Sequence, residues 1–458
     1  MGTLKVGAGK AVINPSEDLF PLGKFEAVKD DVHVRALVVE NDGVRFLLLE
    51  YEPGHPPAPE FKKEISERYS IPEELIITTS IHNHSSCDWG INEKKIPGMS
   101  APIKMPPEAL RKALEFEEIV RKGTWKAVDD ALNALRPARY GYGEGSSYIN
   151  CNKDWLQEDG HYTEGMAFDG DVDRTLSVLK FEDEEGNLIS VLLNYPCQES
   201  VANGSLDVDG KVKFTPAFPG YACNYIEKRY GNGSVVLWTC GTAGDLGAIF
   251  SAACSPREFD PEDGFNHVIP LPPGSGYIIQ RYLGELHAID ALKVLKDLEC
   301  TETDMPIRCT TGKVELEGQD VPEGADMFAN FAKINNSLAK MHPELCDEKG
   351  RPLDDRRVQM VKTGTVDLNM QLVMLGDIAY VGFAGEPYVE IGMQCKAASP
   401  ARHTVIIAPT SRDSAEFIVS DGSADHDSFQ TFSRVYKGNN NKPIIDGMLK
   451  MFAQLRAD

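Results

Sequence analysis

Two histidines, His82 and His84, follow a short apolar segment, Leu75–Ile77. In a β-strand, residues two apart face the same side, so both imidazoles are expected to project together where the strand ends. Such a pair can bind one metal ion, or it can combine a metal ligand with a proton carrier. Two polar side chains bonded to backbone at a strand exit would give the same spacing, so both interpretations stay open.

A carboxylate, Glu386, follows the apolar segment Ile378–Phe383 and precedes a helical pattern that begins at Pro387. Ligands of α/β proteins often bind where a strand gives way to a helix. Proline is favoured at the first helical position, and a carboxylate beside it interacts well with the helix dipole. Glu386 is therefore interpreted either as a metal ligand or as a helix cap.

A glycine-rich turn, residues 241–247, follows the apolar segment Val235–Cys240. Closely spaced glycines such as Gly244 let backbone N–H groups approach an oxyanion or a phosphate. The spacing matches neither a P-loop nor a dinucleotide fingerprint, which argues against a nucleotide site. Asp245 in this turn either completes a pocket or caps the turn.

Three further groups have a chemical and a plain interpretation. Cys197 is either a nucleophile or, as expected for a thiol in an apolar stretch, buried and inert. Lys153 either holds an anionic group of a substrate or is solvated. The cluster Asp425, His426 and Asp427 either caps a site or belongs to a solvated loop.

Strand-like segments alternate with helical ones, which predicts an α/β fold with at least part of the sheet parallel. Turn sequences at 40–43 and 183–187 predict two hairpins, so the sheet is expected to be mixed. The expected strands are 34–40, 44–50, 75–81, 176–181, 188–195, 235–240, 374–383 and 404–408. The expected helices are 58–69, 107–135 (with Gly123 as a candidate break), 220–230, 278–298, 387–398 and 443–455.

The composition limits the partners and the compartment. The formal net charge is -23, from 70 acidic against 47 basic residues, which argues against nucleic acid or an anionic membrane as a partner. We find no run of about 18 apolar residues and no signal peptide. Ten cysteines without a repeated spacing indicate reduced thiols and a cytoplasmic protein. A homo-oligomer remains open.

The order of several motifs resembles the N-terminal catalytic domain of neutral, non-lysosomal ceramidases and their bacterial relatives. The resemblance implies a mixed, partly parallel sheet flanked by helices, in a single domain over 1–458 without the family's C-terminal Ig-like domain. Residues 251–274 and 319–362 are expected to be irregular insertions. The matching segments are Val6–Lys10, Asn14-Pro15, Thr79–Ser85, Asn150–Lys153, Asp171–Asp173, Leu176–Phe181, Asn194–Gln198, Phe218–Ala222, Thr242–Asp245 and Gly385–Pro387.

The resemblance also implies a zinc site. Residue by residue, His82 and Glu386 match zinc ligands, and His84 matches a catalytic neighbour. Gln198 stands where the family has its second zinc histidine, and an amide oxygen is a weaker zinc donor than imidazole. A site of these ligands is expected to bind a divalent metal, with zinc first, although the glutamine favours a harder ion or none.

Other positions depart from the family pattern. Gly247 replaces a serine beside the Gly-Asp pair, and Lys153 replaces an arginine, which loses bidentate recognition. The region of the family's tyrosine ligand is occupied by Arg412–Phe417. These departures make ceramide itself an unexpected substrate.

The sequence therefore predicts a metal-dependent hydrolase of a C–N bond in a small polar substrate. His84 is expected to transfer a proton, with Lys153 and Asp245 as catalytic partners. Asn152, Gly244 and Arg412 are expected to bind the substrate. Two alternatives stay open: a lyase or isomerase acting on a sugar-like or hydroxy-acid substrate, and a non-catalytic binding relative.

Overall fold

The structure is a computed structural model, and it describes most of the chain. The described residues are 4–87, 89, 93–94, 103–104, 106–157, 160, 162–250, 257–260, 265–268, 271–318, 344, 346–347, 353, 365–411, 417–426, 428, 430–431, 434 and 436–457. Most of the two expected insertions, 251–274 and 319–362, lies outside them, although β16 (Arg257–Asp260) and β17 (Phe265–Val268) pair as a short hairpin.

The largest sheet has eight strands in the order β14-β12-β11-β8-β1-β3-β4-β5. Most neighbours are antiparallel, but β4 pairs with β5 and β12 with β14 in parallel, so the mixed sheet is confirmed. The strands are β1 (Lys5–Val12), β3 (His33–Asn41), β4 (Val44–Tyr51), β5 (Ile76–Ser80), β8 (Arg136–Ser146), β11 (Thr175–Asp183), β12 (Leu188–Tyr195) and β14 (Val235–Cys240).

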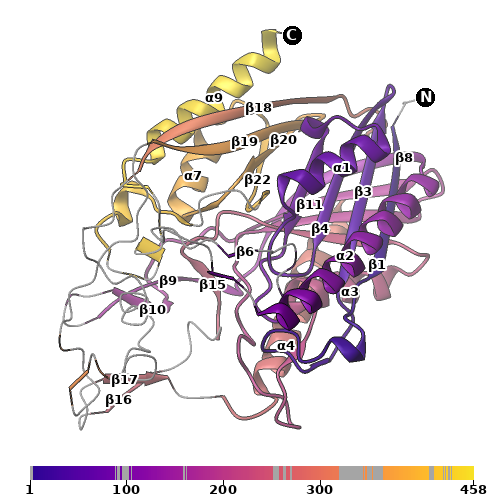
Figure 1. Ribbon diagram of the computed structural model, residues 1–458. Coiled ribbons are helices and arrows are strands. Elements are labelled where there is room, and N and C mark those ends of the chain that lie inside the picture. Colours follow the sequence, from indigo (N-terminus) through magenta and orange to yellow (C-terminus); the bar gives the residue numbers. More distant parts are fainter. Residues whose placement is uncertain are drawn as a thin grey trace.

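A second sheet of four strands, β18 (Ile307–Glu317), β19 (Thr365–Leu375), β20 (Ile378–Phe383) and β22 (His403–Ile407), follows late in the chain. Alternate residues of its strands enter two different cores. One core, with Val373 and Tyr380, joins it to the large sheet, and the other, with Leu372 and Val381, joins it to the C-terminal helices. The helix α9 (Asn441–Ala457) lies along this sheet in Figure 1.

Helices cover the other face of the large sheet, so the layers run helix, sheet, sheet, helix. Side chains of α1 and α2 share a core with β3 and β4, and those of α3 and α4 share one with β11, β12 and β14. The α/β class is thus confirmed. The helices are α1 (Pro59–Tyr69), α2 (Pro107–Asn133), α3 (Ala217–Tyr230), α4 (Ser275–Asp297) and α7 (Val389–Ala398).

Three local expectations were wrong. The expected strand 374–383 is the end of β19, a turn at Gly376 (φ 61) and the whole of β20. The helix α2 continues through Gly123 without a break. Glycine stands there because α2 packs closely on Ile13, and any side chain at this position would clash with it. The helix expected from Pro387 begins at Val389, because Glu386 and Pro387 form the short strand β21, which pairs with β23 (Phe417–Ile418).

Both expected hairpins are confirmed. Asp42 and Gly43 have positive φ angles of 50° and 80° between β3 and β4, as a two-residue hairpin turn requires. Gly186 has a φ of 83° in the turn that joins β11 to β12.

A buried charge cluster joins the two ends of the large sheet. The fully buried guanidinium of Arg35 on β3 lies 3.0 Å from Glu52 and 3.8 Å from Glu50, and it also binds Glu227 on α3. Arg35 also donates to the carbonyl of Val236 on the free edge of β14, at 3.0 Å. This cluster therefore holds β14 against β3 and β4, although four strands lie between β14 and β3 and five between β14 and β4 in the sheet order.

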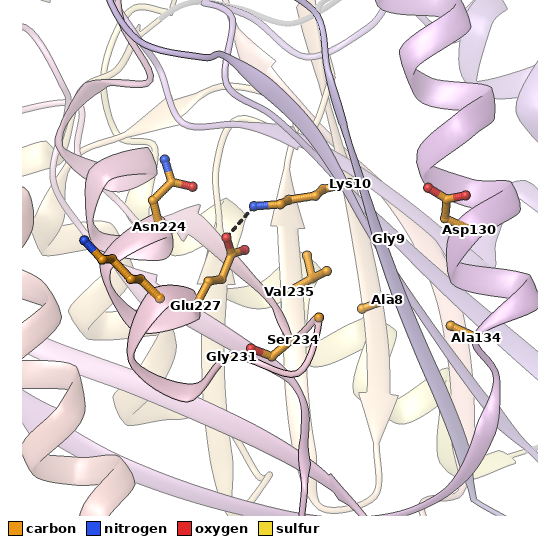
Figure 2. A pocket seen from close by; sticks show the side chains of 12 residues that line it. Ala8, Gly9, Lys10, Asp130, Ala134, Asn224, Glu227, Gly231, Ser234 and Val235 are labelled. Carbon is orange, nitrogen blue, oxygen red and sulfur yellow. Dashed lines mark hydrogen bonds and ion pairs between the residues drawn. The ribbon is translucent and has the colours of Figure 1, made fainter.

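The outer side of the cluster is closed by a second cation. Lys10 on β1 reaches Glu227 on α3 at 2.5 Å, beside a cavity of about 640 Å³ (Figure 2). Glu50 accepts from the backbone N–H of Trp238 at 3.2 Å. After Arg35, it is the second side chain that gives a backbone group on the edge of β14 a hydrogen-bond partner. Burial raises the pKa of Glu50 well above its ordinary value.

We predict that Arg35→Met lowers the free energy of unfolding by about 3–5 kcal/mol, because it leaves buried carboxylates without their cation. Chemical denaturation at neutral pH measures this. The matched control is Arg45→Met, which removes an arginine that is 45% exposed in its pair with Glu40 and should cost less than about 1 kcal/mol. Equal effects of the two substitutions would contradict the role given to Arg35.

Candidate active site

The ends of three segments far apart in the sequence meet at one place. His82 and His84 follow β5, Gln198 follows β12, and Glu386 lies in β21 after β20. The histidines lie beyond the strand itself, because the chain leaves β5 at Ser80 and His82 has a left-handed φ of 56°. Their rings nevertheless stack, with centroids 5.2 Å apart, so the expectation that they lie together is confirmed for a different geometric reason.

His82 and Glu386 form a buried pair. Nε2 of His82 lies 2.8 Å from Oε1 of Glu386, and their side chains are only 7% and 12% exposed. Burial disfavours the charged form of both groups, but their mutual attraction outweighs it: the pKa of His82 is raised and the pKa of Glu386 is lowered. Glu386 therefore stabilises the proton that His82 takes up on its second ring nitrogen.

His84 extends this pair towards solvent. Its Nε2 lies 3.2 Å from Nδ1 of His82, so carboxylate and two imidazoles form a continuous chain of hydrogen-bonding atoms. Burial, reinforced by the neighbouring His82, lowers the pKa of His84 well below its ordinary value. His84 is therefore neutral near pH 7 and can accept a proton.

Gln198 lies between the imidazoles and Lys153. Its Oε1 accepts from the ammonium of Lys153, and its Nε2 lies 3.3 Å from Nδ1 of His82 and 3.4 Å from Nε2 of His84. The ammonium has only protons to offer, so it fixes the amide with oxygen towards Lys153 and nitrogen towards the rings. Lys153 is 1% exposed, so the expectation of a solvated lysine was wrong.

This arrangement is a poor match for the expected metal. Of the three expected ligands, His82 and Glu386 bind each other, and the carbonyl oxygen of Gln198 is turned to a cation. Among the described residues, no group of three or more His, Cys, Asp or Glu side chains is placed to hold a metal ion. The donors that zinc prefers, imidazole nitrogen and carboxylate or thiolate, are therefore too few without rearrangement.

A cavity of about 910 Å³ opens beside the two imidazoles. Its wall includes His82 and His84, together with His55 after β4 and the lysines Lys24 and Lys112. The sequence reasoning missed His55, whose ring centroid lies 5.7 Å from that of His82. Strand pairing could have pointed to His55: β4 and β5 are parallel neighbours, so the loops that follow them lie at the same end of the sheet.

Asp245 lies behind the site and holds its parts in place. Its Oδ1 accepts from the N–H of Val389 at 2.7 Å, at the start of α7, and its Oδ2 accepts from Asn152 at 3.0 Å. A side chain at Gly244 would meet the carbonyl oxygen of Glu386 at 2.5 Å, so glycine allows the turn to press against β21. Burial raises the pKa of Asp245 to about 7.

The amide of Asn152, expected to bind substrate, is committed within the protein. It donates to the carbonyl of Asp171 and to Asp245, and it accepts from the N–H of Asp154. The structure thus gives Asn152, Gly244 and Asp245 contacts that position the site, and their catalytic or substrate-binding roles stay predictions. Arg412 lies outside the described residues.

Two other candidates from the sequence, Cys197 and His426 of the cluster at 425–427, lie among residues of the protein itself. Cys197 is fully buried within a hydrophobic core, as expected for an inert thiol. Asp425 is exposed, as expected for a solvated loop, whereas His426 is 20% exposed, pairs with Asp154 at 2.8 Å and stacks on Tyr162 with centroids 3.7 Å apart. Asp427 lies outside the described residues.

A buried carboxyl beside the histidine loop, Glu199, was not anticipated. Its backbone carbonyl accepts from the N–H of His84, and its Oε1 accepts from Gln280 at 2.8 Å. Burial raises the pKa of Glu199 from 4.5 to about 7. No sequence pattern distinguished it, since only the packing of α4 on this loop removes it from water.

Comparison with known proteins identifies the fold. No family model matches the chain, and no curated protein matches it. Two solved structures match over 100% of this chain, each with a TM-score of 0.68: a ceramidase complexed with C2, at 15% identity and 76% of that chain, and the neutral ceramidase from Pseudomonas aeruginosa, at 16% identity and 75% of that chain. The chain therefore has a ceramidase-like fold at low sequence identity. Among the described helices, none is long and apolar enough to cross a membrane.

We predict that Glu199 makes stability fall as the pH rises from about 4.5 to 8. A carboxyl with a raised pKa in the folded state stabilises the protein when protonated, and this contribution is lost as the pH climbs from the unfolded pKa through about 7. The expected loss is about 3 kcal/mol. Denaturation curves of the parent and Glu199→Gln should therefore diverge over this range, with the variant less sensitive to pH.

The matched control is Glu67→Gln, because the side chain of Glu67 is 69% exposed. Its stability curve should stay parallel to that of the parent protein. A Glu199→Gln curve that also ran parallel to the parent would contradict the raised pKa.

Proposed function

We propose that this protein is a hydrolase that cleaves an amide-type C–N bond in a small polar substrate. The observation that carries the proposal is the chain of contacts from Glu386 through His82 to His84, which ends at the wall of a cavity of about 910 Å³. A carboxylate that supports an imidazole base is a recurring arrangement for activating water or another nucleophile.

The atoms define a route for the proton. The route starts with His82 protonated only on Nε2, which faces Glu386, and with His84 protonated only on Nε2, so Nδ1 of His84 can take a proton from a water molecule in the cavity. The Nε2 proton then passes to Nδ1 of His82 over 3.2 Å, and the charge that results is stabilised by Glu386 at 2.8 Å. The same histidine can return a proton to the leaving amine, as general acid–base catalysis requires.

The reaction class rests on two supports. The fold matches solved ceramidases, and the motif order in the sequence resembles that family, whose members cleave an amide. The polar character of the substrate is the weaker part of the proposal: Lys24 and Lys112 support it, but the same cavity wall carries the apolar side chains of Leu22, Phe25 and Ala113.

Metal dependence remains a prediction from the resemblance to ceramidases. The resemblance would place a divalent ion at His82, Gln198 and Glu386, where it would supply Lewis-acid chemistry. The contacts that occupy these three side chains support a route that uses the imidazoles alone. Hydrolysis is proposed with either a metal-dependent route or a route that uses the imidazoles alone.

We predict that His84→Ala lowers kcat/KM by about 10²–10⁴-fold, because it removes the group that accepts the proton. The measurement is amine release from a panel of N-acylated amino acids and other small amides. His403→Ala is the matched control, since His403 lies at the start of β22 and is absent from the cavity wall. It should leave the rate unchanged.

The same panel separates the alternatives. Incorporation of solvent deuterium into recovered substrate, without amine release, would point to a lyase or isomerase instead. Binding of a panel compound without any turnover, and unchanged by His84→Ala, would point to a non-catalytic relative.

A further inference from the structure

Lys153 is a fully buried cation beside the two imidazoles. Strand β9 (Asn150–Leu156) places it, because the N–H of Lys153 donates to the carbonyl of Asp245 at 2.7 Å and β9 pairs with β15 (Leu246–Ala248). Gln198 is also bonded to β15, because its N–H donates to the carbonyl of Leu246 at 3.1 Å. The carbonyls of Asp245 and Leu246 thus hold the backbones of Lys153 and Gln198 next to each other.

The ammonium of Lys153 has two contacts beside the site. It donates to Oε1 of Gln198 and lies 5.7 Å from the ring centroid of Phe417. Phe417 on β23 is in turn paired in register with Glu386 on β21. Lys153 therefore lies between the amide that contacts both imidazoles and the strand pair that carries the carboxylate.

We infer that Lys153 is the built-in cation of this site: it orients Gln198 and excludes a divalent metal ion from the position between His82, Gln198 and Glu386. This inference concerns the site of the proposed function and rests on that proposal only for the site's catalytic role. Lys153 acts here as a positioning residue, because it reaches the imidazoles through Gln198 and its own side chain is not part of the cavity wall.

Two physical effects carry the inference. A lysine ammonium can only donate, so the oxygen of Gln198 must face it, and the amide presents N–H groups to the rings where a metal needs a lone pair. A divalent ion in that position would also stand close to a compact buried ammonium, whose point charge repels it more than the delocalised charge of an arginine would. The buried carboxylate of Glu386 already has its compensating charges in Lys153 and His82.

The inference is tested by titrating the full-length protein with Zn²⁺ in a calorimeter, without substrate. The parent protein and His82→Ala should give the same isotherm, because the only Zn²⁺ they bind is taken up elsewhere, for example by the ten cysteines. The double variant Lys153→Met/Gln198→His replaces the cation and supplies a nitrogen donor. It should gain one site that is lost when His82→Ala is added.

The single variant Gln198→His separates the two effects. It keeps the ammonium, so it should bind Zn²⁺ at this site about 10–100-fold more weakly than the double variant. Lys153→Arg keeps the charge but changes its shape, and it should bind no more Zn²⁺ than the parent protein. Circular dichroism and thermal unfolding check that each variant is folded.

Two results would overturn the inference. One is a Zn²⁺ site in the parent protein that disappears in His82→Ala, a comparison that stands even if the double variant fails to fold. The other is a folded double variant that binds Zn²⁺ no better than Gln198→His. Either result leaves hydrolysis itself standing, whereas absence of amide cleavage in the substrate panel would remove the proposed function and leave the titration unaffected.

Discussion

The arrangement of this protein depends on one buried arginine. Arg35 lies among Glu50, Glu52 and Glu227 and reaches the backbone of β14, which is the far edge of the eight-stranded sheet. A guanidinium in the interior must have its charge and its donors satisfied, which only one placement of the surrounding strands allows. Arg35 therefore holds the edge strand β14 near β3 and β4, and the ends of β5 and β12 come together although they lie near opposite edges of the sheet.

The candidate site repeats the same principle with fewer groups. Lys153 and Glu386 are buried with opposite charge, and Gln198 and His82 lie between them in hydrogen-bonding contact. Each member constrains the next, so the site is held by electrostatics as well as by packing. Asp245 and Gly244 add a backbone constraint, since they press the glycine-rich turn against β21 and the start of α7.

The chain has a ceramidase-like fold, and a shared fold does not by itself fix the chemistry of a site. The positions of the two histidines and the glutamate at strand ends follow from the sheet topology. The groups around them differ: a glutamine and a lysine stand where the family resemblance places a histidine and an arginine. Glutamine and lysine differ from histidine and arginine in donor type and in hydrogen-bond geometry, and such a change of residues does not require a strand to move.

The sequence by itself predicted the hairpins at Asp42-Gly43 and Asp183–Asn187 and the candidate residues His82, His84 and Glu386, because turn chemistry and strand-end polarity are local. It predicted the main helices but missed the strands β8, β9 and β18. It misplaced the start of α7, since the pairing of Glu386 and Pro387 with β23 is a tertiary contact that overrides helix propensity. Only the tertiary structure revealed His55, Glu199 and the orientation of Gln198. These depend on which loops meet, on what is removed from water and on which charge an amide faces, and none of the three is a property of a residue and its sequence neighbours.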